Sequence, residues 1–304
     1  MNPTFPTALN RREFLGTAAG AATAALCSIA APSTVQGAEE KIPKPDAVGL
    51  IDTNVNLGRW PFRRLPLEET PRLVAKLRAG GVAFALAGSF ETHLHKDITA
   101  VNTRLADECH HRGENLLVPI GAINPMLPGW EEDLRQCAEI HGMPGIRLHP
   151  NYHGYTLKDP IFARVLTLTG ERNMLVQIAV SMEDERTLHP LVNVPPTDVA
   201  PLPAILEKFP RARLQLLNVF RTVRGKLIQD LAAARVRFEI ATLEGVAGIA
   251  NLLEQVNPTC LLFGSNAPFY YFESSQLKLQ ESPLSAEQLH AIREGNARSF
   301  MSVH

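Results

Sequence analysis

The chain has 304 residues, with 30 Lys and Arg against 31 Asp and Glu, a formal net charge of −1 at pH 7 and 45% hydrophobic residues. Balanced charge of this kind excludes a dominant surface for nucleic acid or for an anionic membrane, so we expect no nucleic-acid partner. The length is that of one large domain and not of several small ones.

The first 37 residues predict an export signal. Arg11 and Arg12 form a twin-arginine pair, which is followed by an apolar, Ala-rich run over residues 16–31. This order is typical of a cleaved twin-arginine signal peptide. The run is shorter than the ~20 residues needed to span a membrane, which disfavours an anchor. We therefore expect residues 1–37 to engage the twin-arginine export machinery and to leave a periplasmic or extracellular mature protein without membrane anchoring.

After a linker over residues 38–47, residues 48–304 alternate short apolar runs with helical patterns, which indicates βα units. The expected strands are residues 49–56, 83–88, 116–123, 145–149, 174–181, 214–219, 236–242 and 260–265. The expected helices are residues 67–78, 98–112, 130–141, 160–172, 202–208, 226–234, 246–255 and 285–301, the last with a capping-box pattern at Ser285 and Gln288. Eight units in about 265 residues match the ~250 residues typical of a (β/α)8 barrel. The sequence therefore predicts the α/β class and a single (β/α)8 TIM barrel.

The longest interruption, residues 181–202, follows the fifth expected strand and is rich in proline. A long loop at this end of a barrel is a candidate lid or substrate wall, with a rigid surface loop as the alternative. Glu183 and His189 lie in it as candidate substrate-binding residues, and a salt-bridge cluster within the loop is the alternative for them.

Polar residues fall in phase at the ends of the expected strands, where the active site of a (β/α)8 barrel lies. Because alternate strand residues point inward, we expect Asp52, Asn54 and Asn56 inside the barrel, and Ile51 and Thr53 facing the helices. The inward polar residues of the later strands are Arg147, His149, Gln177, Asn218 and Asn266.

Arg147 and His149 are the strongest chemical pair. A buried arginine needs an anionic partner, which is either Asp52 or the carboxylate of a substrate. His149 is the leading general acid–base, because its unperturbed pKa lies near neutrality, and a histidine that only hydrogen-bonds the rim is the alternative. His153 and Glu244 complete the predicted catalytic set, with Glu244 as a carboxylate that activates water.

Two motifs carry a family resemblance. Residues 52–56 read Asp-Thr-Asn-Val-Asn, and residues 263–268 read Phe-Gly-Ser-Asn-Ala-Pro. They resemble the Asp-X-His-X-His and Phe-Gly-Ser-Asp-X-Pro motifs of the amidohydrolase-related family. That family comprises metal-dependent hydrolases and aminocarboxymuconate-semialdehyde-decarboxylase-like lyases, and the resemblance implies a (β/α)8 barrel from residue 48 to the C-terminus.

The resemblance also implies metal ligands at positions where this chain carries amides. These positions hold Asn54 and Asn56 on the first strand, the stretch that begins at Gln177 on the fifth, Asn218 on the sixth and Asn266 on the eighth. A neutral amide oxygen is a poor ligand for zinc. We therefore predict no metal cofactor, and we assign these side chains to hydrogen bonds with a substrate or a developing oxyanion.

A relocated zinc site is the alternative. His93 and His95 form a His-X-His pattern after the second expected strand, where they would act with Glu91 and His149. Two solvated loop histidines are the other interpretation. Tyr270 lies in an aromatic run that is suited to an apolar or cyclic ligand or, alternatively, to loop packing.

Together these features predict an exported hydrolase that acts on a small organic substrate bearing a carboxylate or a carbonyl, without the family's usual metal centre. The alternatives are a non-catalytic barrel that binds a ligand or a partner, and a non-oxidative decarboxylase. The sequence leaves the substrate and a homo-oligomeric state undetermined.

Overall fold

The computed structural model describes residues 49–302. The predicted signal peptide, the predicted linker and the first residue of the predicted barrel domain lie outside the described residues. Among residues 49–302, no helix combines the length and the apolar character needed to cross a membrane.

The described strands are all parallel and form a barrel. They are β1 (Leu50–Leu57), β2 (Val82–Ser89), β3 (Leu117–Pro119), β4 (Gly121–Ala122), β5 (Gly145–Leu148), β6 (Leu175–Ala179), β7 (Arg213–Leu217), β8 (Arg237–Glu239) and β9 (Leu261–Leu262). They pair in the order β1-β2-β3 and β4-β5-β6-β7-β8-β9. Ile120 lies between β3 and β4 and donates its N–H to Ala87 O at 2.8 Å, so β3 and β4 continue a single barrel strand.

The barrel closes where β1 meets the segment after β9. Asn266 N donates to Asn54 O and Asn56 N donates to Ala267 O, both at 2.8 Å. With β3 and β4 counted as one, the strands number eight, as the sequence predicts.

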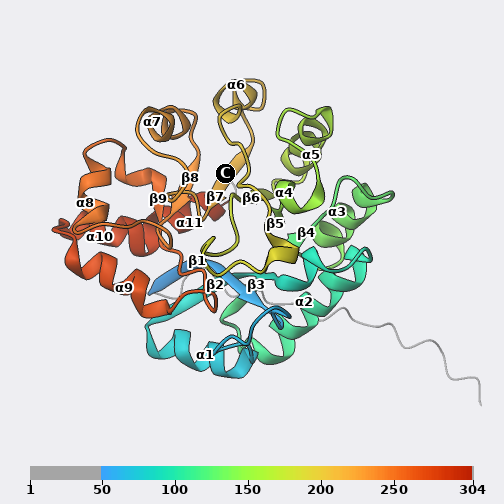
Figure 1. Cartoon of the computed structure of the whole chain (residues 1–304), viewed down its shortest axis with the longest axis horizontal. Coiled ribbons are helices and arrows are strands. Elements are labelled where there is room, and N and C mark those ends of the chain that lie inside the picture. The colour runs from blue at the N-terminus through green and yellow to red at the C-terminus, as the bar shows by residue number, and fades with distance from the viewer. Residues whose placement is uncertain (1–48, 303–304) are drawn as a thin grey trace, which may run out of the picture. The chain divides into compact units, whose positions relative to one another are not determined.

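Helices surround the strands (Figure 1). They are α1 (Thr70–Ala79), α2 (Ile98–Arg112), α3 (Trp130–Glu139), α4 (Pro150–His153), α5 (Pro160–Glu171), α6 (Leu202–Leu206), α7 (Lys226–Ala233), α8 (Gly248–Leu253), α9 (Phe272–Glu281), α10 (Ala286–His290) and α11 (Asn296–Met301). Short helices η1 (Phe90–His93), η2 (Pro190–Val192), η3 (Pro258–Cys260) and η4 (Ala291–Gly295) lie between them. The capping box of Ser285 and Gln288 is confirmed at the start of α10, whereas α4 and α9 were not predicted.

The predicted phase of β1 is wrong at two residues. Ile51 packs in an apolar cluster inside the barrel with residues of β2, β3 and α11, and the Thr53 hydroxyl accepts a hydrogen bond from Gln215 Nε2 at 2.7 Å. The physical reason is a shift in register between Asp52 and Val55, which opposes three β1 residues to two of β2. The shift lets both Thr53 and Asn54 face the interior.

Asp52 ties β1 to the segment that closes the barrel. Its carboxylate accepts hydrogen bonds from Ser265 N at 3.0 Å and from Ser265 Oγ at 2.5 Å, and from Asn54 N at 3.0 Å. Complete burial raises the pKa of Asp52 to about 6, although these bonds oppose the shift. The closure therefore contains a buried carboxylate that favours its neutral form more than an exposed one does.

We predict that Asp52→Asn removes a pH dependence of folding. Between the ordinary pKa of 3.8 and the folded-state pKa of about 6, the folded chain binds more protons at Asp52 than the unfolded chain. The free energy of unfolding should therefore fall as pH rises from about 4 to about 6, by at most about 3 kcal/mol from this group. Urea unfolding across this pH range should show a flatter profile for Asp52→Asn, and an unchanged profile would contradict the assignment. Asp230→Asn, at an exposed ion pair with Lys226, is the matched control.

Candidate functional site

Four asparagines at the barrel mouth form a buried amide network. Asn54 Nδ2 donates to Asn218 Oδ1 at 3.2 Å, and Asn56 Nδ2 donates to Asn266 Oδ1 at 3.0 Å. All four are at most 3% exposed. The sequence prediction that they lie together inside the barrel is therefore correct in its geometry, but the amides bond to one another and to the chain.

Glu239 lies directly beneath this network. Its Oε1 accepts hydrogen bonds from Asn218 N at 2.6 Å and from Asn54 Nδ2 at 3.4 Å. Gly264 leaves the room it needs, because a Cβ there would lie 2.7 Å from the Glu239 Cβ. Burial raises the pKa of Glu239 to about 7, against the lowering effect of the Asn218 and Ala241 N–H groups.

Arg147 is buried inside the barrel without a carboxylate partner. Its Nε donates to Gln177 Oε1 at 2.9 Å, and its Nη1 donates to Asn56 Oδ1 at 2.7 Å and to Val55 O at 3.1 Å. The predicted ion pair with Asp52 is therefore wrong, because neutral oxygens take its place and the Asp52 carboxylate is occupied by Ser265. Burial lowers the pKa of Arg147 to about 10, so the guanidinium remains charged at neutral pH.

Three histidines gather beside Arg147, and we call His93, His149 and His153 the histidine cluster. The ring centroids of His93 and His149 are 4.1 Å apart, and those of His149 and His153 are 6.0 Å apart. Burial lowers all three pKa values: that of His93 to about 3, that of His149 well below 6.5, and that of His153 less strongly. The cluster is therefore neutral at pH 7 in the free protein.

Hydrogen bonds assign the tautomers of two members of the cluster. His93 Nδ1 lies 3.1 Å from Phe90 O, and His153 Nε2 lies 3.2 Å from Thr92 O. A carbonyl only accepts, so we infer that these two nitrogens carry the protons. His93 Nε2 and His153 Nδ1 then each present a lone pair.

The site is marked by buried polar atoms that lack a hydrogen-bond partner among the described residues. Around the histidine cluster these are Trp60 Nε1, His93 Nε2, Arg147 Nη2, His149 Nδ1, His153 Nδ1 and Glu183 Oε1. Such atoms are rare in folded proteins because each costs about 1–3 kcal/mol when left unpaired. Their concentration beside one cation indicates a place that a polar ligand or water fills.

An apolar cover closes the mouth above these atoms, and we call it the aromatic cap. Its buried members include Trp60, Phe90, Phe269, Met182 and Val192, with Phe62 and Tyr152 at its margin. Trp60 lies 5.2 Å from Phe269 and 6.3 Å from His93 between ring centroids. The cap therefore joins the histidine cluster directly.

Several predicted site residues lie elsewhere. Glu244 is 62% exposed at its side chain and pairs with Arg221 at 3.2 Å, not with a histidine. His95 is exposed while His93 is turned inward, and Glu91 pairs with Arg104 on the surface. The predicted relocated metal site therefore does not assemble, because the chain turns through η1 between the two histidines.

The remaining candidate site residues lie in the long loop after β6 and in the aromatic run after β9. Glu183 pairs with Arg63 at 2.5 Å, with a side chain only 1% exposed, and His189 stacks on Phe62 at 5.0 Å. Of the predicted aromatic wall, Phe269 enters the cap, whereas Tyr271 is exposed. Burial raises the pKa of Tyr270 to about 12.

Sequence reasoning missed much of the cap and part of the polar interior. Phe90, Met182 and Gln215 were not singled out. The run of Val, Ala and Gly that precedes Phe90 signals a buried strand end. We find no local signal that places Met182 in the same cluster as Trp60.

Surface hollows lie away from the amide network. Four of them have volumes of about 440, 450, 540 and 420 Å³. None of these four is lined by Asn54, Asn56, Asn218 or Asn266. Trp60 lines the last of them together with neighbouring residues of its own loop.

A closed parallel barrel with polar residues at the carboxyl ends of its strands defines a (β/α)8 barrel of the kind that hosts enzymes. The chain belongs to the amidohydrolase family, whose model, described as "Amidohydrolase", matches residues 61–301. Among curated proteins, none matches the chain. The recognised family and the predicted barrel are thus confirmed.

Solved structures with the same fold include three decarboxylases. The 2,6-dihydroxybenzoate decarboxylase from Rhizobium has a TM-score of 0.61 at 13% identity, with 82% of this chain and 98% of that one covered. The 5-carboxyvanillate decarboxylase from Novosphingobium aromaticivorans gives 0.65 at 14%, covering 85% and 98%. The dihydroxybenzoic acid decarboxylase from Polaromonas gives 0.62 at 11%, covering 82% and 97%. At these identities the similarity shows the fold.

The comparison corrects one prediction. The Novosphingobium and Polaromonas decarboxylases both contain bound manganese. This finding contradicts the prediction that no metal cofactor is used, because divalent metal centres occur on this fold among its structural neighbours.

The donor atoms of this chain do not fit such a centre in the described arrangement. Asn54, Asn56 and Asn266 offer neutral amides that already bond to other groups. Among residues 49–302, no group of three or more His, Cys, Asp or Glu side chains is placed to hold a metal ion.

We predict that Gly88→Ala disturbs the site through Arg147. A Cβ at Gly88 would lie 2.7 Å from Arg147 Nη1 and 2.9 Å from its Cζ, so the guanidinium must move and lose its bonds to Asn56 and Val55. We expect a loss of about 1–3 kcal/mol in the free energy of unfolding, measured by urea titration. Gly170→Ala in α5, where the nearest atom is 4.0 Å away, is the control and should lose nothing. Equal stabilities of both variants would refute the packing argument.

Proposed function

We propose that this chain is a carbon–carbon lyase of the amidohydrolase family, a non-oxidative decarboxylase that acts on a small hydroxyl-bearing carboxylate. The observation that carries the proposal is the concentration of unpaired polar atoms around Arg147 beneath the aromatic cap. The decarboxylase neighbours support the reaction class over hydrolysis.

The unpaired Arg147 Nη2 is the binding group for the carboxylate. Two of the three guanidinium nitrogens are saturated by neutral oxygens, so the cation keeps its full charge and both N–H bonds of Nη2 remain free. Charge-assisted bonds to a carboxylate are about twice as strong as neutral ones. The unpaired indole N–H of Trp60 is a second, neutral donor on the cap side.

The unpaired imidazole nitrogens complement a hydroxyl group. His93 Nε2 and His153 Nδ1 present lone pairs, and a substrate hydroxyl donates to one of them. The flat rings of Trp60, Phe90 and Phe269 suit an aromatic body between the two polar ends. A carboxylate, a hydroxyl and an aromatic ring together define the substrate class.

The site can accept and deliver the protons that a decarboxylation requires. An imidazole takes the hydroxyl proton, and the resulting imidazolium delivers it to the ring carbon that bears the carboxylate. The bond between that carbon and the carboxyl group then breaks, its electron pair returns to the ring, and CO2 leaves. The phenolate product recovers a proton from solvent, so the net reaction consumes one proton.

A bound carboxylate also changes the histidines. In the free protein, burial and Arg147 hold the pKa values of His93 and His149 below the ordinary value. An anion at Arg147 offsets its positive field and raises these pKa values. Binding therefore makes the imidazoles stronger bases toward the substrate hydroxyl.

The second candidate function is ligand binding without turnover. The observation in its favour is the amide network, which occupies the positions of the metal ligands implied by the family motifs and bonds internally. A site of this kind keeps the Arg147 anion contact and the cap but carries out no chemistry.

We predict decarboxylation of hydroxybenzoates by the mature protein, assayed by CO2 release with and without added Mn²⁺. Product incubated with the protein in D2O should exchange the ring hydrogen, as seen by NMR. Of His93→Gln and His153→Gln, the variant that removes the accepting imidazole should lower kcat by 10²–10⁴-fold with little change in Kd, and Arg147→Lys should mainly weaken binding. Arg164→Gln, in an exposed bidentate pair with Glu131, is the control.

The outcomes of this assay separate the two candidates. Calorimetric binding without CO2 release or ring exchange would support the binding protein and reject the decarboxylase. Absence of both binding and turnover across the hydroxybenzoate panel would reject both.

We further propose that the mature enzyme acts outside the cytoplasm, after twin-arginine export. Replacing Arg11 and Arg12 together by Lys should retain the protein in the cytoplasm, since receptor recognition reads this pair. Cell fractionation with N-terminal mass spectrometry measures the location and the cleavage point, expected near residue 37. Glu13→Gln is the control, and unchanged export of the double variant would contradict the assignment.

A further inference from the structure

The segment after β6 is fixed at both ends over the barrel mouth. At its start, Asn218 Nδ2 donates to Ser181 O at 2.9 Å, and Asn266 Nδ2 donates to Met182 O at 3.0 Å. At its end, Thr197 N donates to Val180 O at 2.9 Å. The ends of the intervening loop therefore lie close together, as in an Ω-loop.

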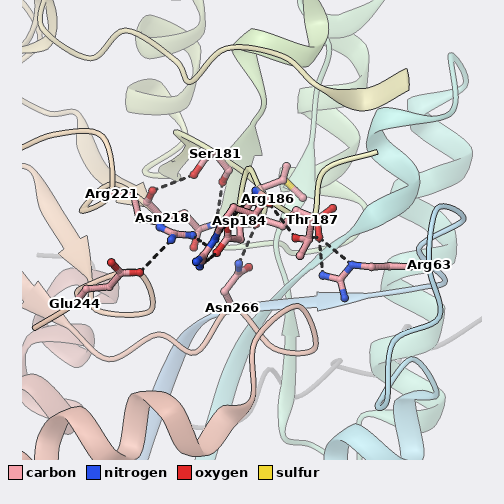
Figure 2. A network of polar contacts seen from close by, with 11 residues as sticks. Arg63, Ser181, Asp184, Arg186, Thr187, Asn218, Arg221, Glu244 and Asn266 are labelled. Atoms are coloured by element: carbon pink, nitrogen blue, oxygen red, sulfur yellow. Dashed lines mark hydrogen bonds and ion pairs between the residues drawn. The ribbon is translucent and has the colours of Figure 1, made fainter. Parts of the chain in front are cut away.

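Ion pairs strengthen the first anchor from two sides. Figure 2 shows Asp184 and Arg186 of the loop between Arg221 on one side and Arg63 on the other. Arg221 bonds Asp184 at 2.5 Å, and Arg63 bonds the preceding residue, Glu183. The amides of Asn218 and Asn266 lie below this segment, and the cations of Arg63 and Arg221 lie beside it. Together they hold residues 181–184 to the barrel.

In the middle of the loop, residues 185–196, Arg186 and Thr187 bond back to Asp184 and Glu183 of the anchor, and residues 188–196 are held by few contacts. His189 stacks on Phe62 with centroids 5.0 Å apart, Asn151 Nδ2 donates to Pro195 O at 3.1 Å, and Val192 enters the aromatic cap. The neighbouring Leu191 is 82% exposed. None of the three contacts is an ion pair.

These contacts lead directly to the histidine cluster. Val192 belongs to the same apolar cluster as Trp60 and the margin residue Tyr152, and the Tyr152 ring lies 4.7 Å from that of His93. Release of the middle of the loop would therefore uncover the cap side of the unpaired atoms. The amide network beneath the fixed start would stay covered.

We propose that residues 185–196 form a flap that opens between two fixed anchors to admit the substrate to the histidine cluster. The inference rests on the proposed function for the identity of what enters, but the motion itself is independent of turnover. Opening beyond Thr187 leaves the bonds of Arg186 and Thr187 to the anchor in place and breaks one ring stack, one hydrogen bond and one apolar contact. The ion pairs of Asp184 and Glu183 survive, so no buried charge is left unpaired.

Val192 is buried and the neighbouring Leu191 is exposed, so substitutions at these two residues give a matched test. Val192→Ser removes the apolar anchor, whereas Leu191→Ser makes the same kind of change one residue away on the solvent side. In Val192→Ser, hydrogen exchange of residues 185–196 should be about tenfold faster, equivalent to about 1.4 kcal/mol. Leu191→Ser should exchange like the unchanged protein.

Trp60 provides a second readout. With Trp130→Phe as the background, Trp60 in the cap is the source of the remaining tryptophan fluorescence. In this background, Val192→Ser should increase the quenching of that fluorescence by acrylamide, and Leu191→Ser should leave it unchanged. Equal exchange and quenching in the two serine variants would overturn the flap, and so would exchange of residues 185–196 only at the rate of global unfolding.

Locking the flap tests its role in access. Phe62→Cys with His189→Cys, joined by a short cleavable bismaleimide, should suppress hydroxybenzoate binding, and cleavage of the linker should restore it. Undiminished binding in the locked protein would overturn the access role. A Val192→Ser effect on exchange, together with no hydroxybenzoate binding by any variant, would support the flap and reject the proposed function.

Discussion

The barrel mouth is organised around one buried cation whose neighbours are neutral. A guanidinium only donates hydrogen bonds, so each group that faces Arg147 must present an oxygen. This fixes the amides of Gln177 and Asn56 with their nitrogens turned away. Gln177 Nε2 then donates to Thr53 O and to Gln215, and the orientation of one charge propagates through the interior of the barrel.

The same constraint explains how polarity is divided at the mouth. Two of the buried carboxylates are saturated by hydrogen bonds, Asp52 by Ser265 and Glu239 by the Asn218 and Ala241 N–H groups. The amides between them satisfy one another. Among the described residues at the mouth, the unpaired atoms gather on the other side of Arg147, toward η1, α4 and the loop after β6, which is where the proposed ligand binds.

The fold could be predicted because apolar runs and their spacing report strands and helices directly. The candidate site could be predicted only in part. The shift in register in β1 is a local irregularity that strand phase cannot reveal, and it turned Thr53 inward. The predicted carboxylate partner of Arg147 was wrong because several neutral oxygens satisfy the guanidinium in place of one charged group. The cap joins Trp60, Phe90 and Phe269, which are far apart in sequence and meet only in the folded chain.

The reciprocity of the amide network has an evolutionary consequence. Asn266 accepts from Asn56 and donates to Met182 O, so each amide serves two neighbours with different requirements. A single reversion toward the family motif, such as a carboxylate at position 266, would remove a donor from a buried carbonyl before any new function is gained. Such substitutions are strongly non-additive. The amide residues therefore depend on one another, and substitutions at these positions are expected to occur together.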